Sequence, residues 1–213
     1  MRSSIAPLKI KAAIGSAALR RTRSGSTATV AEMLSPTTTY YWRIDEKNGF
    51  GTTTGTVWSF TTAPTLYYPS SYTVNVGGYV SGTLPASVNA ADSSYFVTQS
   101  QTSGTMRYST ATYTVANVSP PSATQMVVNV TLGSSSPSTN LKLYLYNNAT
   151  SAFDLKLTTT VSTSQAAKTF TVTSGASNYV NSSTGNVQLK VEAYKTSTTF
   201  TLLDDVIQLV VTP

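Results

Sequence analysis

The sequence predicts an all-β protein whose main part is an antiparallel β-sandwich. Charged residues make up only 10% of the chain, against about 25% in ordinary globular domains. Ser, Thr, Gly and Asn take their place; Thr favours strands, whereas Gly, Asn and Ser favour turns. Short segments of alternating apolar and polar residues recur along the chain, and no segment has the period of a helix.

The chain contains neither Cys nor His. It therefore has no disulfide framework, no Cys-ligated metal site, no Ser-His-Asp triad and no His-ligated zinc. Adjacent acidic residues occur only at Asp45–Glu46 and Asp204–Asp205. Because adjacent strand residues point to opposite faces, neither pair is a natural hydrolase dyad, and we expect no enzymatic activity.

The formal net charge of +6 is concentrated at the N-terminus. Six bases precede the first acid, Glu32, and the rest of the chain holds eight bases and eight acids. The remainder of the chain is therefore neutral overall. A nucleic-acid-binding domain needs a basic stripe on a folded face, so we exclude nucleic acid as a partner.

Residues 1–25 are basic, rich in Ala and Ser, and free of acids. Lys9 and Lys11 interrupt the apolar run, which makes the segment a poor secretory signal. A transit peptide and an amphipathic helix on a membrane surface are alternatives. We predict a disordered or non-native lead, and no run reaches the roughly 20 apolar residues of a membrane span.

Residues 26–63 carry a specific motif. The segment "LSPTTTYYWRIDEKNGFG" is followed by "GTVWSFTT". Together they resemble the E–F corner, F strand and G strand of a fibronectin type III domain, in the version found in large secreted bacterial proteins. The matching positions are Leu34, Pro36, Thr38, Tyr40, Trp42, Ile44, Asn48 and Gly51.

The resemblance implies that Tyr40 is a tyrosine corner, whose hydroxyl bonds to the upstream backbone. Tyr40 and Trp42 share one strand face, and Trp58 and Phe60 share one on the next strand. We expect an E strand at 26–33 and no A, B or C strand before it, so only the second half of the domain is expected. Half a sandwich has a bare inner face, which favours contact with another domain or chain.

Residues 64–213 contain eight or more strand-like segments, among them "NLKLYLYN" and "TFTLLDDVIQLVVT". In "NLKLYLYN", alternation predicts that Leu141, Leu143 and Leu145 point inward. Two packed sheets are the natural closure for so many short strands. The order of the segments resembles a jelly-roll module seen beside fibronectin-like domains in secreted bacterial proteins. More loosely, "LLDDVIQL" resembles the closing strand of galactose-binding-like jelly rolls, which include many carbohydrate-binding modules.

The outward residues of the segments "NLKLYLYN" and "NVQLKVEAY" form a candidate sugar-binding face. Sugars stack their apolar faces on aromatic rings, and polar side chains take their hydroxyls. The alternative is that these tyrosines cover a sheet face simply because they are good strand formers. The candidate residues are Lys142, Tyr144, Tyr146, Gln188, Lys190, Glu192 and Tyr194.

Asp92, Asp204 and Asp205 are candidates for a structural calcium site. Calcium takes carboxylate and carbonyl oxygens, and the jelly-roll resemblance implies that an Asp of the closing strand helps to hold an ion. A partner Glu near the first strand is missing, because Glu32 and Glu46 lie in the preceding unit. The alternative is an exposed pair of acids at a turn or strand end, and no other cofactor is expected.

The sequence thus predicts a non-catalytic accessory module of a secreted or cell-surface protein, with a polysaccharide or cell-surface glycan as its ligand. The alternative is a structural spacer or adhesion module that binds no small molecule. In that case the bare fibronectin-like half and the sheet edges make protein–protein contacts.

Overall fold

The structure is a computed structural model that describes residues 8–14, 17–23, 34–48, 51–119 and 123–212. The chain divides into two compact units, Met1–Pro64 and Thr65–Pro213. Regular structure in the described residues consists of strands and the short 3-10 turns Ala86–Val88 and Ala176–Tyr179. No helix among these residues has the length and hydropathy to cross a membrane. The predicted all-β class is confirmed.

The first unit is an antiparallel sheet with the order β2-β1-β3-β4, in which β5 also pairs with β3. β1 and β2 form a hairpin, and β1 pairs with β3 at Ile10 and Ile44. The strands are β1 Leu8–Ile14, β2 Ala17–Arg23, β3 Thr39–Asn48, β4 Gly51–Thr53 and β5 Val57–Thr61.

The two N-terminal strands differ from the disordered lead predicted for residues 1–25. The letters "LKIK" at the start of β1 alternate apolar and basic residues, which is a strand pattern. The Ala-rich, basic composition around them obscured this pattern. The E strand predicted at 26–33 lies outside the described residues.

Tyr40 on β3 is buried, and its hydroxyl accepts a hydrogen bond from the backbone N–H of Ser35 at 2.7 Å. Ser35 lies five residues upstream, so this is the contact that the fibronectin resemblance implies for Tyr40. The bond ties the turn before β3 to the strand. That the unit is half of a fibronectin type III domain stays a prediction.

One face of β3 and β5 carries an aromatic row, made of Tyr40, Trp42, Trp58 and Phe60. The register pairs Tyr40 with Phe60 and Trp42 with Trp58. The ring centroids of these pairs are 5.6 Å and 4.7 Å apart. Trp58 and Phe60 are each 46% exposed. Much of this apolar face is therefore not covered by other residues that the structure describes.

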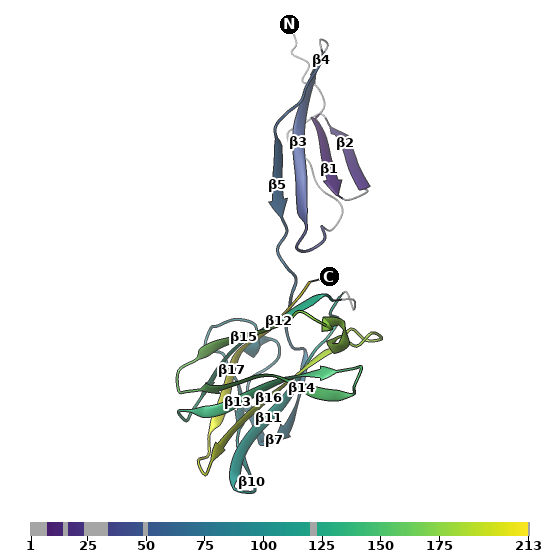
Figure 1. The fold of residues 1–213 in the computed structure, drawn as a ribbon. Coiled ribbons are helices and arrows are strands. Elements are labelled where there is room, and N and C mark those ends of the chain that lie inside the picture. Colours follow the sequence, from purple (N-terminus) through teal and green to yellow (C-terminus); the bar gives the residue numbers. More distant parts are fainter. Residues whose placement is uncertain (1–7, 15–16, 24–33, 49–50, 120–122, 213) are drawn as a thin grey trace. The chain divides into compact units, whose positions relative to one another are not determined.

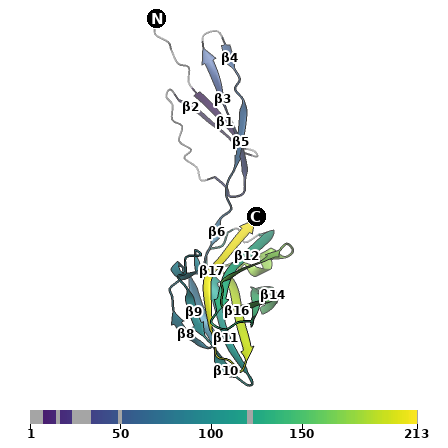
Figure 2. The ribbon, with the colours of Figure 1, turned by 90° about the vertical axis from the view of Figure 1, so that its left-hand side faces the viewer.

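The second unit consists of two antiparallel sheets. One has the order β10-β11-β16-β13-β14 with β7 also on β11, and the other β15-β12-β17-β9-β8 with β6 also on β17. Figure 1 shows the first sheet from its outer side, and Figure 2 shows the layers from the side, with β8 and β9 in one and β14 and β16 in the other. The strands are β6 Leu66–Tyr67, β7 Ser71–Val76, β8 Gly78–Ser81, β9 Phe96–Gln99, β10 Gln101–Ser103, β11 Met106–Val115, β12 Gln125–Ser134, β13 Thr139–Asn147, β14 Ala152–Val161, β15 Ala166–Val172, β16 Val187–Thr196 and β17 Thr201–Thr212.

The core lies between these two sheets and is built from alternate strand residues. Leu141, Leu143 and Leu145 of β13 are fully buried in one cluster with Met126 and Val128 of β12. After β11, every connection except the β13–β14 hairpin passes from one sheet to the other, as in a jelly roll. The sandwich and its inward-facing leucines are as predicted. Each fully buried Leu or Met contributes about 1.5–3 kcal/mol of hydrophobic stabilisation.

Candidate functional site

The seven residues of the predicted sugar-binding face lie together on the outer side of one sheet. β13 and β16 are neighbours, and their register pairs Lys142 with Glu192 and Tyr144 with Lys190. Each of the seven alternates with a buried residue, so its side chain points away from the core, and each is half-buried. We call this surface the platform: Lys142, Tyr144, Tyr146, Gln188, Lys190, Glu192 and Tyr194.

Three residues on the flanking strands extend the platform. Tyr108 on β11 pairs with Tyr194, and their rings stack with centroids 5.7 Å apart. Phe153 on β14 pairs with Tyr146, with centroids 5.2 Å apart. Leu155, the next outward residue of β14, is 51% exposed. Strand pairing, rather than any pattern in the sequence, places these three residues beside the platform.

Glu192 links two strands of the platform. Its Oε1 accepts a hydrogen bond from the Tyr144 hydroxyl at 3.2 Å and lies 3.8 Å from Nζ of Lys142. Partial burial, together with the negative charge of Glu192, raises the pKa of Tyr144 to about 12. The Tyr144 hydroxyl therefore stays protonated near neutral pH and serves as a donor.

Both lysines of the platform lie over aromatic rings. Nζ of Lys190 is 4.0 Å from the ring centroid of Tyr144 and 4.6 Å from that of Phe153. Nζ of Lys142 is 5.0 Å from the centroid of Tyr194. These distances are within the roughly 6 Å range of cation–π attraction. The platform therefore presents ammonium groups together with hydroxyls, an amide and ring surface.

Asp204 and Asp205 are both buried, and a β-bulge interrupts the pairing of β17 at this point. Thr131 pairs with Val206, and the next residue, Leu132, pairs with Asp204, so Asp205 is the extra residue. The alternative that these acids form an exposed pair is wrong, because both side chains are buried. The expectation that they point to opposite faces stays a prediction.

The buried carboxyl of Asp204 is incompletely satisfied. Its Oδ2 accepts a hydrogen bond from the Tyr113 hydroxyl, while the Oδ1 atoms of Asp204 and Asp205 are buried without a hydrogen-bond partner. Burial raises the pKa of Asp204 to about 7, against the opposing effect of the Tyr113 bond. A buried carboxyl group normally binds a proton, a hydrogen-bonding partner or a metal ion. Asp204 and Asp205 each have one oxygen that lacks such a partner.

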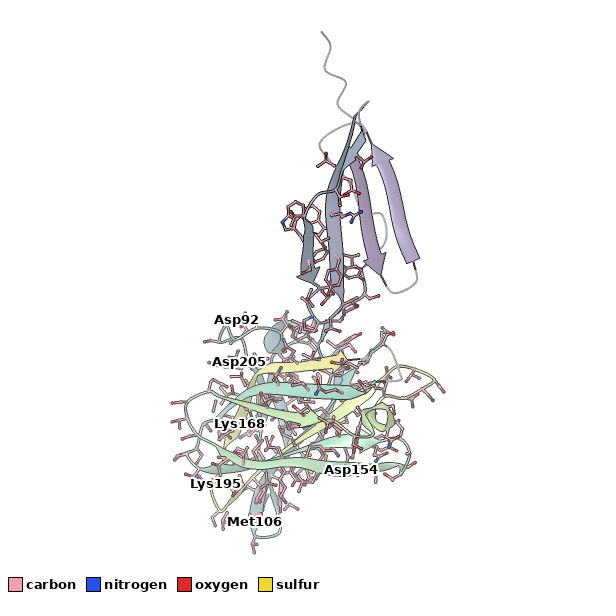
Figure 3. The ribbon with its side chains drawn as sticks, turned by 45° about the horizontal axis from the view of Figure 1, so that its top comes forward. Asp92, Met106, Asp154, Lys168, Lys195 and Asp205 are labelled. Carbon is pink, nitrogen blue, oxygen red and sulfur yellow. The ribbon has the colours of Figure 1, made fainter. Side chains whose placement is uncertain are left out.

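Asp92 does not join Asp204 and Asp205 in a three-carboxylate site. It is exposed on the loop before β9, and its Oδ1 accepts a hydrogen bond from the backbone N–H of Ser94 at 2.9 Å. Figure 3 labels Asp92 on this loop and Asp205 on β17. Nowhere in the described part of the chain do three His, Cys, Asp or Glu side chains gather as a metal-binding group. The carboxylate oxygens left as candidates for calcium are the Oδ1 atoms of Asp204 and Asp205.

Sequence reasoning missed a polar cluster around Asp154 on β14. Its Oδ2 accepts hydrogen bonds from the Tyr179 hydroxyl at 2.6 Å and from Nδ2 of Asn147 at 3.0 Å, and Nζ of Lys156 lies 3.6 Å away. The bond from Tyr179, followed by that from Asn147, lowers the pKa of Asp154 below its ordinary value. The cluster ties the edge strand β14 to the turn Ala176–Tyr179, which is a structural role.

A polar hollow of about 460 Å³ lies apart from the platform. It contains no aromatic side chain, so it offers a sugar ring nothing to stack on. Its lining residues are Gly77, Gly78, Gln99, Ser100, Gln101, Thr102, Arg107 and Thr199.

No protein-family model matches the chain, and no curated protein matches its sequence. Among the solved structures that resemble it at low identity are three carbohydrate-binding modules. TmCBM61 in complex with β-1,4-galactotriose has 14% identity and a TM-score of 0.41, over 67% of this chain and 89% of that one. The xylan-binding module CBM15 has 11% identity and a TM-score of 0.45, over 70% and 97%. A promiscuous carbohydrate-binding module of the β-sandwich superfamily has 12% identity and a TM-score of 0.35, over 97% and 85%. At these values the likenesses carry no argument about what this chain binds.

Proposed function

We propose that residues 65–213 form a non-catalytic module that binds a polysaccharide through the platform. The observation that carries this proposal is that four neighbouring strands, β11, β16, β13 and β14, place aromatic side chains on one outer face, as two groups: Tyr108 with Tyr194, and Tyr144 and Tyr146 with Phe153. The pair of Lys142 and Glu192 lies between the two groups. Aromatic rings with polar groups beside them suit the alternating apolar and hydroxyl-bearing surfaces of sugars. Four strands span about 14 Å, which accommodates several units of a glycan chain.

The proposal assigns no reaction to the platform. Hydrolysis of a glycosidic bond ordinarily uses two carboxyl groups, whereas the platform has a single one, on Glu192, which is engaged by Tyr144 and Lys142. Such a module holds a larger protein or a cell on a glycan. A secreted or cell-surface location is part of this proposal and rests on the resemblance of the sequence to modules of secreted proteins.

We expect the full chain to be retained by at least one member of a panel of soluble and insoluble polysaccharides. Replacing Tyr144 and Tyr146 together by Ala should weaken that binding about tenfold or more, since each aromatic contact contributes about 0.5–1.5 kcal/mol. Affinity electrophoresis and pull-down measure this change. The matched control is Tyr79→Ala, which removes an exposed tyrosine from β8 on the other sheet.

Thermal unfolding of each variant separates loss of binding from loss of folding. A folded double variant that binds as tightly as the wild type would remove the platform from the proposal. No retention on any polysaccharide would reject carbohydrate binding itself and leave the second candidate function.

The second candidate is a spacer or adhesion module that works through protein–protein contacts. The exposed aromatic row of the first unit favours it, because Trp58 and Phe60 are open in the described structure and exposed apolar faces mark association sites. We expect sedimentation velocity of the full chain to show association that grows with concentration. Replacing Trp58 and Phe60 together by Ser should abolish it, whereas Tyr41→Ser, on the opposite face of β3, should not. A strict monomer at every concentration would reject this candidate.

The structural calcium ion stays a prediction. It is supported by the orphaned, buried Oδ1 atoms of Asp204 and Asp205, because calcium takes six to eight oxygen ligands, carboxylates among them. Two carboxyl groups are too few for this coordination, so backbone carbonyl and water oxygens would supply the remaining ligands.

A further inference from the structure

Lys190 is the cation of the platform that lacks an acidic partner. Lys142 lies 3.8 Å from Oε1 of Glu192, whereas no carboxylate in the described part of the chain comes within ion-pair distance of Lys190. The platform has two ammonium groups and one carboxylate, which leaves one net positive charge. That charge is located at Lys190.

The ammonium group of Lys190 is held in place without being neutralised. It lies over the rings of both Tyr144 and Phe153, at 4.0 Å and 4.6 Å from their centroids. Cation–π contacts orient the side chain and use none of the three N–H donors for a conventional hydrogen bond. An arriving acceptor therefore meets a group that is already ordered, which reduces the entropy lost on binding.

The same contacts limit what else can approach these rings. A neutral sugar that stacked on the side of Tyr144 covered by Lys190 would have to displace the ammonium group. An acidic sugar can leave the cation–π contacts in place and pair its anionic group with the free N–H donors. Lys142, over Tyr194, lies diagonally across the register from Lys190 and presents a second, weaker cation.

We infer that the platform selects anionic polysaccharides, with Lys190 pairing with their carboxylate or sulfate groups. This inference rests on the proposed function. Lys, unlike Arg, is a point charge that does not require the planar geometry of a carboxylate, so both kinds of anionic glycan share the chemistry. A single-stranded nucleic acid also combines negative charge with stacking. The protein groove that binds such a strand is normally lined by many basic side chains, whereas the platform has two.

The test compares matched acidic and neutral glycans bound by the full chain. Polygalacturonate is set against its methyl ester, and a sulfated galactan against the unsulfated galactan; a single-stranded oligonucleotide forms a fifth arm. The basic segment before Glu32 will attract any polyanion non-specifically. The inference is therefore judged from variants of the platform, each measured at low and at high salt.

Lys190→Gln should weaken binding of an acidic glycan about tenfold, as expected for one hydrogen bond to a charged group. It should not weaken binding of a neutral glycan, and should strengthen it where the sugar stacks on the side of Tyr144 that Lys190 covers. Glu192→Gln should change acidic binding in the opposite direction, because it removes the negative charge and frees Lys142. Lys168→Gln, on β15 of the other sheet, is the control for net charge. It removes the same charge as Lys190→Gln but should weaken binding of the acidic glycan much less.

Opposite effects of Lys190→Gln and Glu192→Gln on an acidic glycan would support the inference, and the arm in which they occur identifies carboxylate or sulfate. Equal binding of acidic and neutral glycans, insensitive to Lys190→Gln, would overturn it and leave the proposed function intact. Retention of no glycan would overturn both. Oligonucleotide binding that depends on Lys190, without glycan binding, would also overturn both.

Discussion

The free energy of unfolding of the full chain is expected to fall by about 4 kcal/mol between about pH 4 and pH 8 in a chelating buffer. Asp204 is the cause. It is fully buried, and its pKa is about 7 in the folded chain against an ordinary value of 3.8. Below both values the carboxyl is protonated in either state and costs nothing. Above the ordinary value only the folded state holds the proton, so stability falls with rising pH until the folded carboxyl has ionised as well.

Denaturant unfolding at a series of pH values measures this effect. The chain contains no His and no Cys, so few other groups titrate between pH 5 and 8. Asp204→Asn keeps an acceptor for the Tyr113 hydroxyl and removes the titration, so its stability should be nearly flat over this interval. A wild-type profile that is flat, or that rises with pH, would contradict the assignment.

Calcium should oppose the loss of stability at high pH. A bound cation would be the partner that the buried Oδ1 atoms of Asp204 and Asp205 lack. It would stabilise the folded state by about 2.7 kcal/mol at a calcium concentration 100 times its Kd. Asp205→Asn should abolish the increase. If calcium leaves the unfolding curve at pH 8 unchanged, the predicted metal site is wrong, whereas the titration of Asp204 is unaffected.

Leu143→Ala should destabilise the protein by about 2–5 kcal/mol, because it removes a fully buried side chain and leaves a cavity. Leu143 is 0% exposed in the core between the sheets. Leu155→Ala is the matched control: Leu155 lies beside the platform on the adjacent strand β14 and is largely exposed. Its loss should change the free energy of unfolding by about 0.5 kcal/mol or less.

Denaturant unfolding compares the two variants directly when their curves are fitted with the same m-value, the slope of the free energy of unfolding against denaturant concentration. Equal destabilisation by both changes would mean that the outward residues of β13 and β14 are packed under other residues. The platform would then not be a free surface, and the proposed glycan site would lose its basis.

Alternation alone assigned the faces of the strands that matter most. It turned Leu141, Leu143 and Leu145 inward, and the tyrosines of β13 outward, as the structure has them. This works because side chains of a strand alternate whatever the strand pairs with. Alternation did not reveal the bulge at Asp204 and Asp205, where β17 has an extra residue opposite β12, because no local pattern announces it.

Composition was a poorer guide than alternation. It led to a disordered lead in residues 1–25, where the structure has the hairpin of β1 and β2. The basic and Ala-rich letters of this segment fit a leader as well as a strand, and a hairpin that adds to β3 gains its stability from pairing.

The sequence by itself determined the all-β class, the inner and outer faces of the strands and the seven residues of the platform. These follow from side-chain period and from the residue types themselves. Only the tertiary structure decided that β13 lies between β14 and β16, that Tyr108 stacks on Tyr194, and that Lys190 lies over two rings. Those contacts join residues far apart in the chain, and their register depends on how two whole sheets pack, which no local segment encodes.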